Sequence, residues 1–168
     1  MGGKAHGGRR VERTEAQQIS AFLAREVGQR TDDGSCDKFA LAGSYRRGKA
    51  DSGDLDFVIV PRDPECFDAF CERKFGRLKN GKIARTGLFD GVQVEFYVAT
   101  AENWGTFLQM WTGSHRHNIQ LRARAKKLGY SMSQYGFRHQ ETRELVQCAT
   151  EQEAYDFLGM SYVEPAKR

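Results

Sequence analysis

Residues 43–57 read GSYRRGKADSGDLDF, and this stretch decides the fold. It ends in two aspartates, Asp54 and Asp56, that are separated by a single residue. The adjoining residues 55–60, LDFVIV, are rich in β-branched and aromatic side chains, which predicts a strand. Because side chains alternate across a strand, Asp54 and Asp56 share one face, while Leu55 points the other way into the core.

One interpretation of this stretch is a P-loop, in which backbone amides cradle phosphates. Gly43, Gly48 and Lys49 fit the glycine and lysine spacing of that motif. However, Ala50 occupies the position where a hydroxyl must reach magnesium. A turn at residues 51–53 and then a strand are predicted where a P-loop requires a helix.

The other interpretation starts from the two carboxylates. Two like charges on one face repel each other, so the pair indicates either a divalent cation between them or a face open to water. The neighbouring residues favour the cation, because a glycine allows close approach of a ligand and a free amide or hydroxyl can hold a phosphate. These neighbours are Gly43, Ser44 and Gly53, with Arg46, Arg47 and Lys49 as nearby cations.

A third carboxylate fits this geometry. Residues 92–98 alternate, so that one face carries Gln93, Glu95 and Tyr97 and the other face is apolar. If this strand pairs beside the one that begins at Asp54, three carboxylates meet at one edge. Such a set can hold two Mg²⁺ ions about 3.5–4 Å apart, as in-line phosphoryl transfer requires. The alternative for Glu95 is an exposed strand residue.

The rest of the chain predicts an α+β fold with a mixed sheet packed on helices. The predicted helices cover residues 13–25, with Thr14 as its cap, 65–75, 102–110, 115–128 and 151–158. The predicted strands cover residues 39–41 and 55–60 and a hairpin of 82–88 with 92–98. Residues 31–35 are expected to form a loop and Asn80-Gly81 a turn.

Composition restricts the class of protein. The 168 residues, of which 39% are hydrophobic and 29% charged, suffice for one domain or a domain with a small appendage. No apolar stretch is long enough to span a membrane, and the N-terminus lacks a secretory h-region. The four cysteines form no Cys-x-x-Cys pair, so we expect reduced thiols in a cytoplasmic, intracellular protein.

The net charge of +4 is unevenly distributed. Residues 114–130 contain five lysines and arginines and no acidic residue, which indicates either a polyanionic partner or a solvated helix face. These basic residues are Arg116, Arg122, Arg124, Lys126 and Lys127.

Three ordered blocks resemble the family X DNA polymerases, which comprise DNA polymerase beta and its relatives. The first block is Gly43-Ser44, Arg46-Arg47-Gly48 and Ser52-Gly53-Asp54-Leu55-Asp56, which resembles the nucleotidyltransferase signature. The second is Trp111-Thr112-Gly113-Ser114 with Asn118 and Arg122, and the third is residues 162–168. The resemblance runs from about Arg10 to Arg168.

This resemblance implies a role for each matching residue. Asp54 and Asp56 would bind both of two Mg²⁺ ions, for which Mn²⁺ is a possible substitute, and Glu95 would bind the catalytic ion alone. Gly43, Ser44, Arg47 and Gly53 would hold the triphosphate. Trp111, Thr112 and Gly113 would pack against sugar and base. Asn118 and Arg122 would contact the nascent base pair, and DNA would also bind Arg124, Lys126 and Lys127.

The sequence also departs from the family pattern. The third acid of the family is normally Asp, so Glu95 is one methylene longer, and Met110 replaces a Tyr. Residues 1–10 are Gly-rich and basic, so we expect a flexible tail there. The resemblance implies a catalytic palm at 11–110 and a small α+β thumb at 111–168. We expect neither a lyase domain nor helix-hairpin-helix elements, as in the smallest viral members.

The sequence therefore predicts a monomeric DNA polymerase that transfers a dNMP from a dNTP to the 3′-hydroxyl of primer-template or gapped DNA, in gap filling or repair. Two alternatives remain open. One is a template-independent nucleotidyltransferase that acts on RNA, a small molecule or a protein, which the helix carrying Asn118 and Arg122 argues against. The other is a non-catalytic module that binds DNA ends, which the unusual Glu95 would favour.

Overall fold

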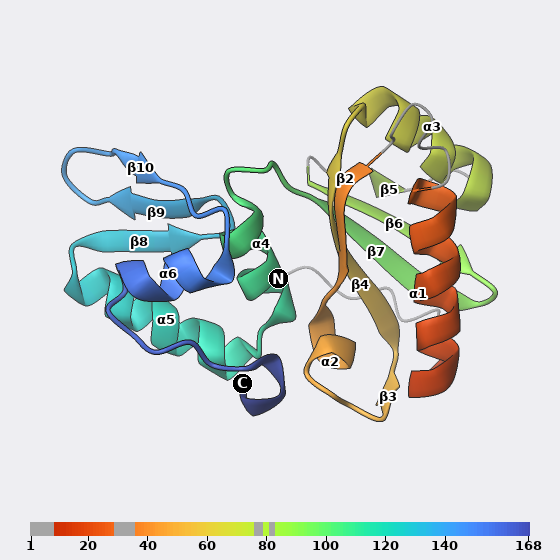
Figure 1. Cartoon of the computed structure of the whole chain (residues 1–168), viewed down its shortest axis with the longest axis horizontal. Coiled ribbons are helices and arrows are strands. Elements are labelled where there is room, and N and C mark those ends of the chain that lie inside the picture. The colour runs from red at the N-terminus through yellow and green to blue at the C-terminus, as the bar shows by residue number, and fades with distance from the viewer. Residues whose placement is uncertain (1–8, 29–35, 76–78, 81–82) are drawn as a thin grey trace.

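The structure is a computed structural model that describes residues 9–28, 36–75, 79–80 and 83–168 (Figure 1). A five-stranded mixed sheet forms one half of the molecule, and a three-stranded sheet with two helices forms the other. The predicted α+β class is confirmed.

The N-terminal half begins with a short strand and a long helix and continues through the large sheet. Its helices are α1 (Arg13–Gly28), α2 (Gly43–Arg46) and α3 (Pro64–Phe75). Its strands are β1 (Val11–Glu12), β2 (Cys36–Leu41), β3 (Asp51–Ser52), β4 (Asp54–Pro61), β5 (Lys79–Asn80), β6 (Ala84–Phe89) and β7 (Val92–Val98).

The large sheet has the strand order β2-β4-β7-β6-β5. Its central pair, β4 and β7, is parallel and places Asp56 opposite Glu95, whereas the other pairs are antiparallel. One face carries Leu55, Phe57 and Phe96 against α1 and α3, all three fully buried. Residues next to these in sequence therefore point to the opposite face, where the candidate site lies.

That opposite face is covered by α4 (Trp104–Thr112), which lies between the two halves (Figure 1). Val58 and Val60 of β4 pack there with Phe107 and Leu108 of α4. The carboxylates of β4 precede these valines on the same face, so this face is apolar at one end and acidic at the other.

The C-terminal half folds around its own small core. It comprises α5 (His115–Lys127), β8 (Tyr130–Ser133), β9 (Gly136–His139), β10 (Leu145–Val146), α6 (Glu151–Phe157) and a 3₁₀ turn (Pro165–Lys167). Leu121, Phe137, Tyr155 and Leu158 are buried in this core.

Several sequence predictions were wrong in detail. Residues 51–52 form strand β3 with β1 instead of a turn, because the backbone of Val11 and Glu12 pairs with them. The helix predicted from 13 to 25 extends to Gly28, so Thr14 lies within it and is not its cap. The short helix α2 was not predicted, because four residues carry no periodic signal.

Other predictions agree with the structure or fall beyond it. The helix predicted at 102–110 covers Trp104–Thr112, and β2 begins at Cys36 rather than residue 39. The loop at 31–35 and residue 81 of the predicted turn lie outside the described residues. All four cysteines are free thiols. Within the described ranges, every helix is too short or too polar to cross a bilayer.

Gly105 provides a test of how closely α4 packs on the C-terminal half. A Cβ at Gly105 would lie 2.1 Å from the backbone carbonyl oxygen of Thr150, just before α6. We expect Gly105→Ala to destabilise the protein by about 1–3 kcal/mol through overpacking, although alanine favours a helix. Urea unfolding measures the change. In the control Gly53→Ala the new Cβ meets nothing closer than Arg10 Nη1 at 4.0 Å, and equal stability losses would contradict the expectation.

Candidate active site

Three carboxylates line one cavity of about 350 Å³ at the edge between the two halves. Asp54, Asp56 and Glu95 reach it because β4 and β7 are parallel and in the register that sets Asp56 opposite Glu95. All three residues are partly exposed, unlike their fully buried neighbour Leu55. The remaining lining residues are Gly43, Ser44, Arg47, Tyr97 and Trp111.

The α2 turn forms one wall of this cavity. The Ala42 N–H donates to the Asp56 carbonyl at 2.7 Å, which ties the start of α2 to β4. Gly43 has a φ of +58°, and a Cβ there would lie 2.1 Å from Asp56 Oδ2. Position 43 therefore requires glycine for both backbone and space. The Ser44 hydroxyl lies 2.5 Å from that of Ser52, which is buried.

Glu95 forms the opposite wall and receives two hydrogen bonds from its own strand. Gln93 Nε2 donates to Glu95 Oε1 at 2.6 Å, and the Tyr97 hydroxyl donates to Oε2. Burial, followed by the charges of Asp56 and Glu95, raises the pKa of Tyr97 well above its ordinary value. Tyr97 therefore stays protonated and acts as a donor. Its ring stacks on Trp111, with centroids 3.5 Å apart.

Carboxylate oxygens are the donors that Mg²⁺ prefers, so the chemistry of this set fits a divalent ion. Among the described residues, however, no three His, Cys, Asp or Glu side chains are already grouped as a metal cluster. Asp54 and Asp56 are separated by Leu55 on β4, and the carboxylate of Glu95 already accepts hydrogen bonds from Gln93 and Tyr97. The three carboxylates thus line one cavity, but in this structure they are not grouped closely enough to form a metal-binding cluster.

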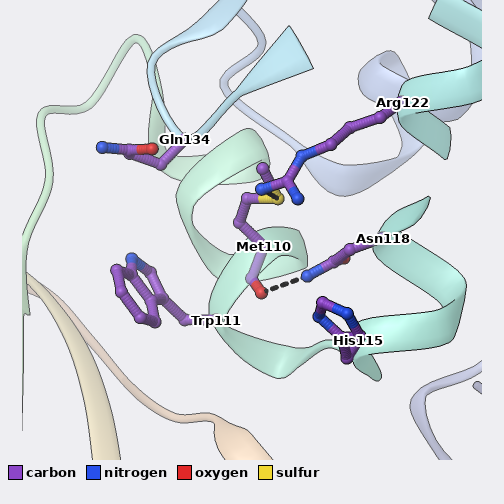
Figure 2. Close-up of a pocket in the computed structure, with 6 residues that line it drawn as sticks. All are labelled: Met110, Trp111, His115, Asn118, Arg122 and Gln134. Carbon is purple, nitrogen blue, oxygen red and sulfur yellow. Dashed lines mark hydrogen bonds between the residues drawn. The ribbon is translucent and has the colours of Figure 1, made fainter. Parts of the chain in front are cut away.

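A second pocket of about 170 Å³ lies between α4 and α5 (Figure 2). Trp111 lines both this pocket and the carboxylate cavity. Asn118 Nδ2 donates to the Met110 carbonyl at 2.8 Å, and its Oδ1 accepts from Gln109 at 2.9 Å. Arg122 Nη2 lies 3.7 Å from Met110 Sδ. In this structure Asn118 therefore joins the two helices, and its predicted base contact remains a prediction.

The remaining residues that the sequence predicts for the site lie mainly at the end of α4 and on the basic helix α5. Thr112 is fully buried, and its carbonyl accepts from Arg47 Nη1. A Cβ at Gly113 would lie 3.2 Å from the same Arg47 nitrogen. Arg124 Nε donates to the Leu158 carbonyl at 2.8 Å, so this arginine is partly used inside the fold. Gly53, Lys126 and Lys127 are exposed.

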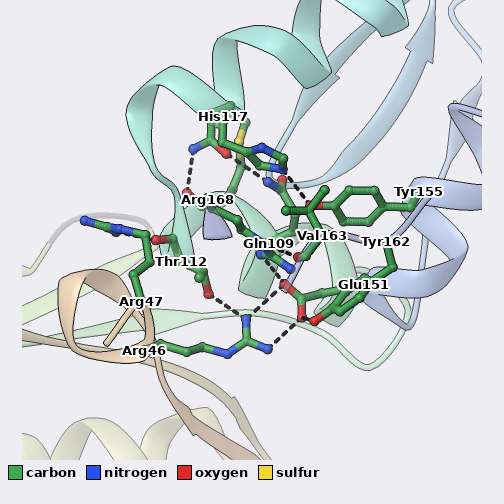
Figure 3. Close-up of polar contacts among 12 residues, drawn as sticks. Arg46, Arg47, Gln109, Thr112, His117, Glu151, Tyr155, Tyr162, Val163 and Arg168 are labelled. Carbon is green, nitrogen blue, oxygen red and sulfur yellow. Dashed lines mark hydrogen bonds and ion pairs between the residues drawn. The ribbon is translucent and has the colours of Figure 1, made fainter. Parts of the chain in front are cut away.

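A polar cluster, which we call the Glu151 clamp, joins the two halves (Figure 3). Glu151 is 8% exposed and accepts bidentate hydrogen bonds from Arg46 at 2.9 and 2.7 Å. Arg168 Nη1 donates to it at 2.8 Å, and the Tyr162 hydroxyl at 3.2 Å. Arg46 also donates to the Thr112 hydroxyl at 2.7 Å. Arg46 therefore has a structural role, whereas the sequence analysis placed it among the cations near a bound ligand.

Sequence reasoning missed Tyr97, Gln93 and the Glu151 clamp as parts of the site. The alternation of residues 92–98 does put Gln93 and Tyr97 on the face of Glu95, so this signal was available. Glu151 carries no local signal, because its partner Arg46 is 105 residues away in the sequence, and Arg168 joins the clamp through Glu151.

Sequence comparison places the chain in a family. The profile described as DNA polymerase beta palm matches residues 10–118, and the profile described as DNA polymerase beta thumb matches residues 107–168. The chain belongs to the family X DNA polymerases. The two profiles overlap at residues 107–118, which include the second half of α4, so the predicted domain boundary after residue 110 remains a prediction.

Named relatives of family X resemble most of the chain. DNA polymerase lambda of Arabidopsis thaliana is 29% identical over 95% of this chain and 36% of its own length. DNA polymerase/3′-5′ exonuclease PolX of Bacillus subtilis is 32% identical over 78% of this chain and 24% of its own length. The chain therefore spans about a third and a quarter of these two relatives.

A viral relative is closer in length. Repair DNA polymerase X of African swine fever virus is 33% identical over 75% of this chain and 78% of its own length. The polymerase beta of Leishmania infantum, solved as a ternary P/T complex, superposes with a TM-score of 0.77 at 20% identity, covering 95% of this chain and 77% of that one. This superposition supports the same fold.

The Glu151 clamp predicts how stability depends on pH. Burial alone would raise the pKa of Glu151, but the hydrogen bond from Arg46 and the charges of Arg168 and Arg46 lower it overall. A lowered carboxyl pKa contributes stability above the ordinary value of 4.5 and loses it as the pH falls through the folded value. We expect Glu151→Gln to cost about 3–5 kcal/mol at pH 7, because the partly buried Arg46 and the buried side chain of Arg168 lose their anion.

The measurement is the free energy of unfolding in urea between pH 3 and pH 7. The difference between wild type and Glu151→Gln should shrink towards the acidic end. Glu141→Gln, which changes an exposed carboxyl between β9 and β10, is the control and should follow the wild type. A difference that stays constant over this range would contradict the assignment.

Proposed function

We propose that this chain is a DNA polymerase that transfers a dNMP from a dNTP to a DNA 3′-hydroxyl by a two-metal-ion mechanism, in gap-filling or repair synthesis. The observation that carries the proposal is the β4–β7 register. It brings Asp54, Asp56 and Glu95 to one cavity, opposite the α2 turn with Ser44 and Arg47. Membership of family X supports the same reaction.

The chain itself supplies position and charge. Ser44 and Arg47 line the same cavity as the carboxylates, and the hydroxyl of Ser44 and the guanidinium of Arg47 would hold the β- and γ-phosphates. Asp54, Asp56 and Glu95 would hold two Mg²⁺ ions, or Mn²⁺, which when bound neutralise phosphate charge and activate the 3′-hydroxyl. Because Gly43 has no side chain, the α2 turn can lie directly against Asp56, and bound phosphates would lie next to the carboxylates.

The DNA would lie along the C-terminal half. Trp111 closes the cavity towards the pocket between α4 and α5, where Asn118 and Arg122 line the wall. The exposed Lys126 and Lys127 extend the positive surface along α5. A nascent base pair in that pocket would have the primer end next to Glu95.

One observation favours template-independent transfer as a second candidate. The side-chain amide of Asn118 is hydrogen-bonded to Met110 and Gln109. These hydrogen bonds would have to rearrange before both ends of the amide could contact a base. Single-nucleotide insertion opposite each of the four template bases separates the two. Templated synthesis requires the inserted base to follow the template, and insertion that ignores the template would establish the second candidate.

The catalytic role of Asp56 is tested by Asp56→Asn. We expect primer extension on gapped DNA with Mg²⁺ to fall by at least about 10²–10³-fold, because a group that stabilises developing charge is lost. Asp156→Asn is the matched control, since Asp156 is exposed on α6 and its carboxylate accepts a local hydrogen bond from Gln152. An Asp56→Asn enzyme with wild-type activity would disprove the proposed mechanism.

The role of the basic helix is tested by the double variant Lys126→Gln/Lys127→Gln. If each lysine neutralises one phosphate, the slope of log K against log salt should become shallower by about 2 units in total. Fluorescence anisotropy of a labelled gapped duplex at several salt concentrations gives the slope. Lys74→Gln on α3, beyond the other face of the large sheet, is the control. An unchanged slope in the double variant would place the DNA elsewhere.

A further inference from the structure

The carboxylate of Glu95 is held in one position by hydrogen bonds from two neighbouring side chains. Its extra methylene adds a rotatable bond, so its carboxylate can occupy more positions than an aspartate could. In this structure each carboxylate oxygen receives one hydrogen bond: Oε1 from Gln93 and Oε2 from the Tyr97 hydroxyl. Both donors lie on the same strand and the same face as Glu95, so β7 fixes its own acid.

Tyr97 is the better fixed of the two donors. Its side chain is 6% exposed, whereas Gln93 is partly exposed. The ring packs flat on the indole of Trp111, with an interplanar angle of 12°. The stack holds the ring in the position from which its hydroxyl donates to Glu95, because a change of side-chain rotamer would break the contact with Trp111.

Trp111 connects this arrangement to the ligand cavities. It is contributed by α4 and borders both the carboxylate cavity and the pocket between α4 and α5. Its indole Nε1 is buried without a hydrogen-bond partner among the described residues. A ligand in either cavity would therefore lie beside the indole ring of Trp111, on which Tyr97 is stacked.

We propose that Tyr97 is a positioning residue for Glu95, holding the longer acid where an aspartate would need no such support, and that Trp111 keeps Tyr97 in place. This inference rests on the proposed function, because Glu95 is a metal ligand only in that mechanism. Tyr97 also lines the carboxylate cavity, and the role assigned to it is to hold Glu95 rather than to bind substrate or metal. Its contribution passes entirely through the hydroxyl bond to Glu95.

The first test is Tyr97→Phe, which removes the hydroxyl and keeps the stacked ring. Loss of a group that orients a metal ligand costs about 10–100-fold in activity or metal affinity. We expect kcat for single-nucleotide insertion to fall by that factor and the Mg²⁺ concentration for half-maximal rate to rise. The KM for dNTP should change much less. Tyr130→Phe, which removes a hydroxyl from β8 in the other half, is the matched control.

The second test separates a role through Glu95 from a general effect on packing. In Glu95→Asp the carboxylate is withdrawn by roughly one C–C bond length, about 1.5 Å, beyond reach of the Tyr97 hydroxyl. Tyr97→Phe should then have no further effect on kcat or on the Mg²⁺ requirement. The same loss in both backgrounds would show that Tyr97 acts independently of Glu95 and would overturn the inference.

The third test addresses Trp111 and needs no catalysis. Calorimetric titration with Mn²⁺ alone should show weaker binding for Tyr97→Phe and for Trp111→Leu, and the double variant should be less impaired than the sum of the two. Additive losses, or wild-type binding by Tyr97→Phe, would overturn the inference. If wild type extends no primer, the proposed function fails, while this titration still decides whether Tyr97 supports Glu95.

Discussion

The parallel pairing of β4 with β7 is the constraint on which the site depends. Because the register sets Asp56 opposite Glu95, the two strands deliver acids to one face and apolar residues to the other. A shift of one residue in β7 would exchange these faces, burying Glu95 and exposing Phe96. The hydrophobic core therefore enforces the position of the acids, and the same burial that stabilises the sheet also assembles the cavity.

A second constraint comes from the charge at the junction of the two halves. Arg46 is the last residue of α2 and Arg47 follows it directly, yet Arg46 belongs to the Glu151 clamp and Arg47 lines the carboxylate cavity. Because both arginines also bond to Thr112, at its hydroxyl and its carbonyl, the α2 turn is tied to the end of α4. The candidate phosphate-binding group is thus placed by an ion pair that itself has no part in binding phosphate.

Much of this architecture could be predicted from the sequence, where the signal is local. The alternation along β7 and the Asp-x-Asp at the start of β4 predicted which side chains share a face, and the structure shows the strand pairing that a shared carboxylate site requires. The β1–β3 pair and the clamp could not be predicted, because they depend on contacts between distant residues. The stack of Tyr97 on Trp111 was missed for a related reason: alternation gives a face but not what covers it.

The closeness of α4 to the C-terminal half restricts how the two halves can move. Gly105 leaves no space between its own backbone and that of Thr150, and the other side of α4 is packed into the sheet through Phe107 and Leu108. The contact with Thr150 is made by backbone atoms, whereas the contact with the sheet is made by side chains, which can repack. A change in the angle between the halves is therefore expected at the contact of α4 with the sheet, as a hinge in which α4 and the C-terminal half move as one body.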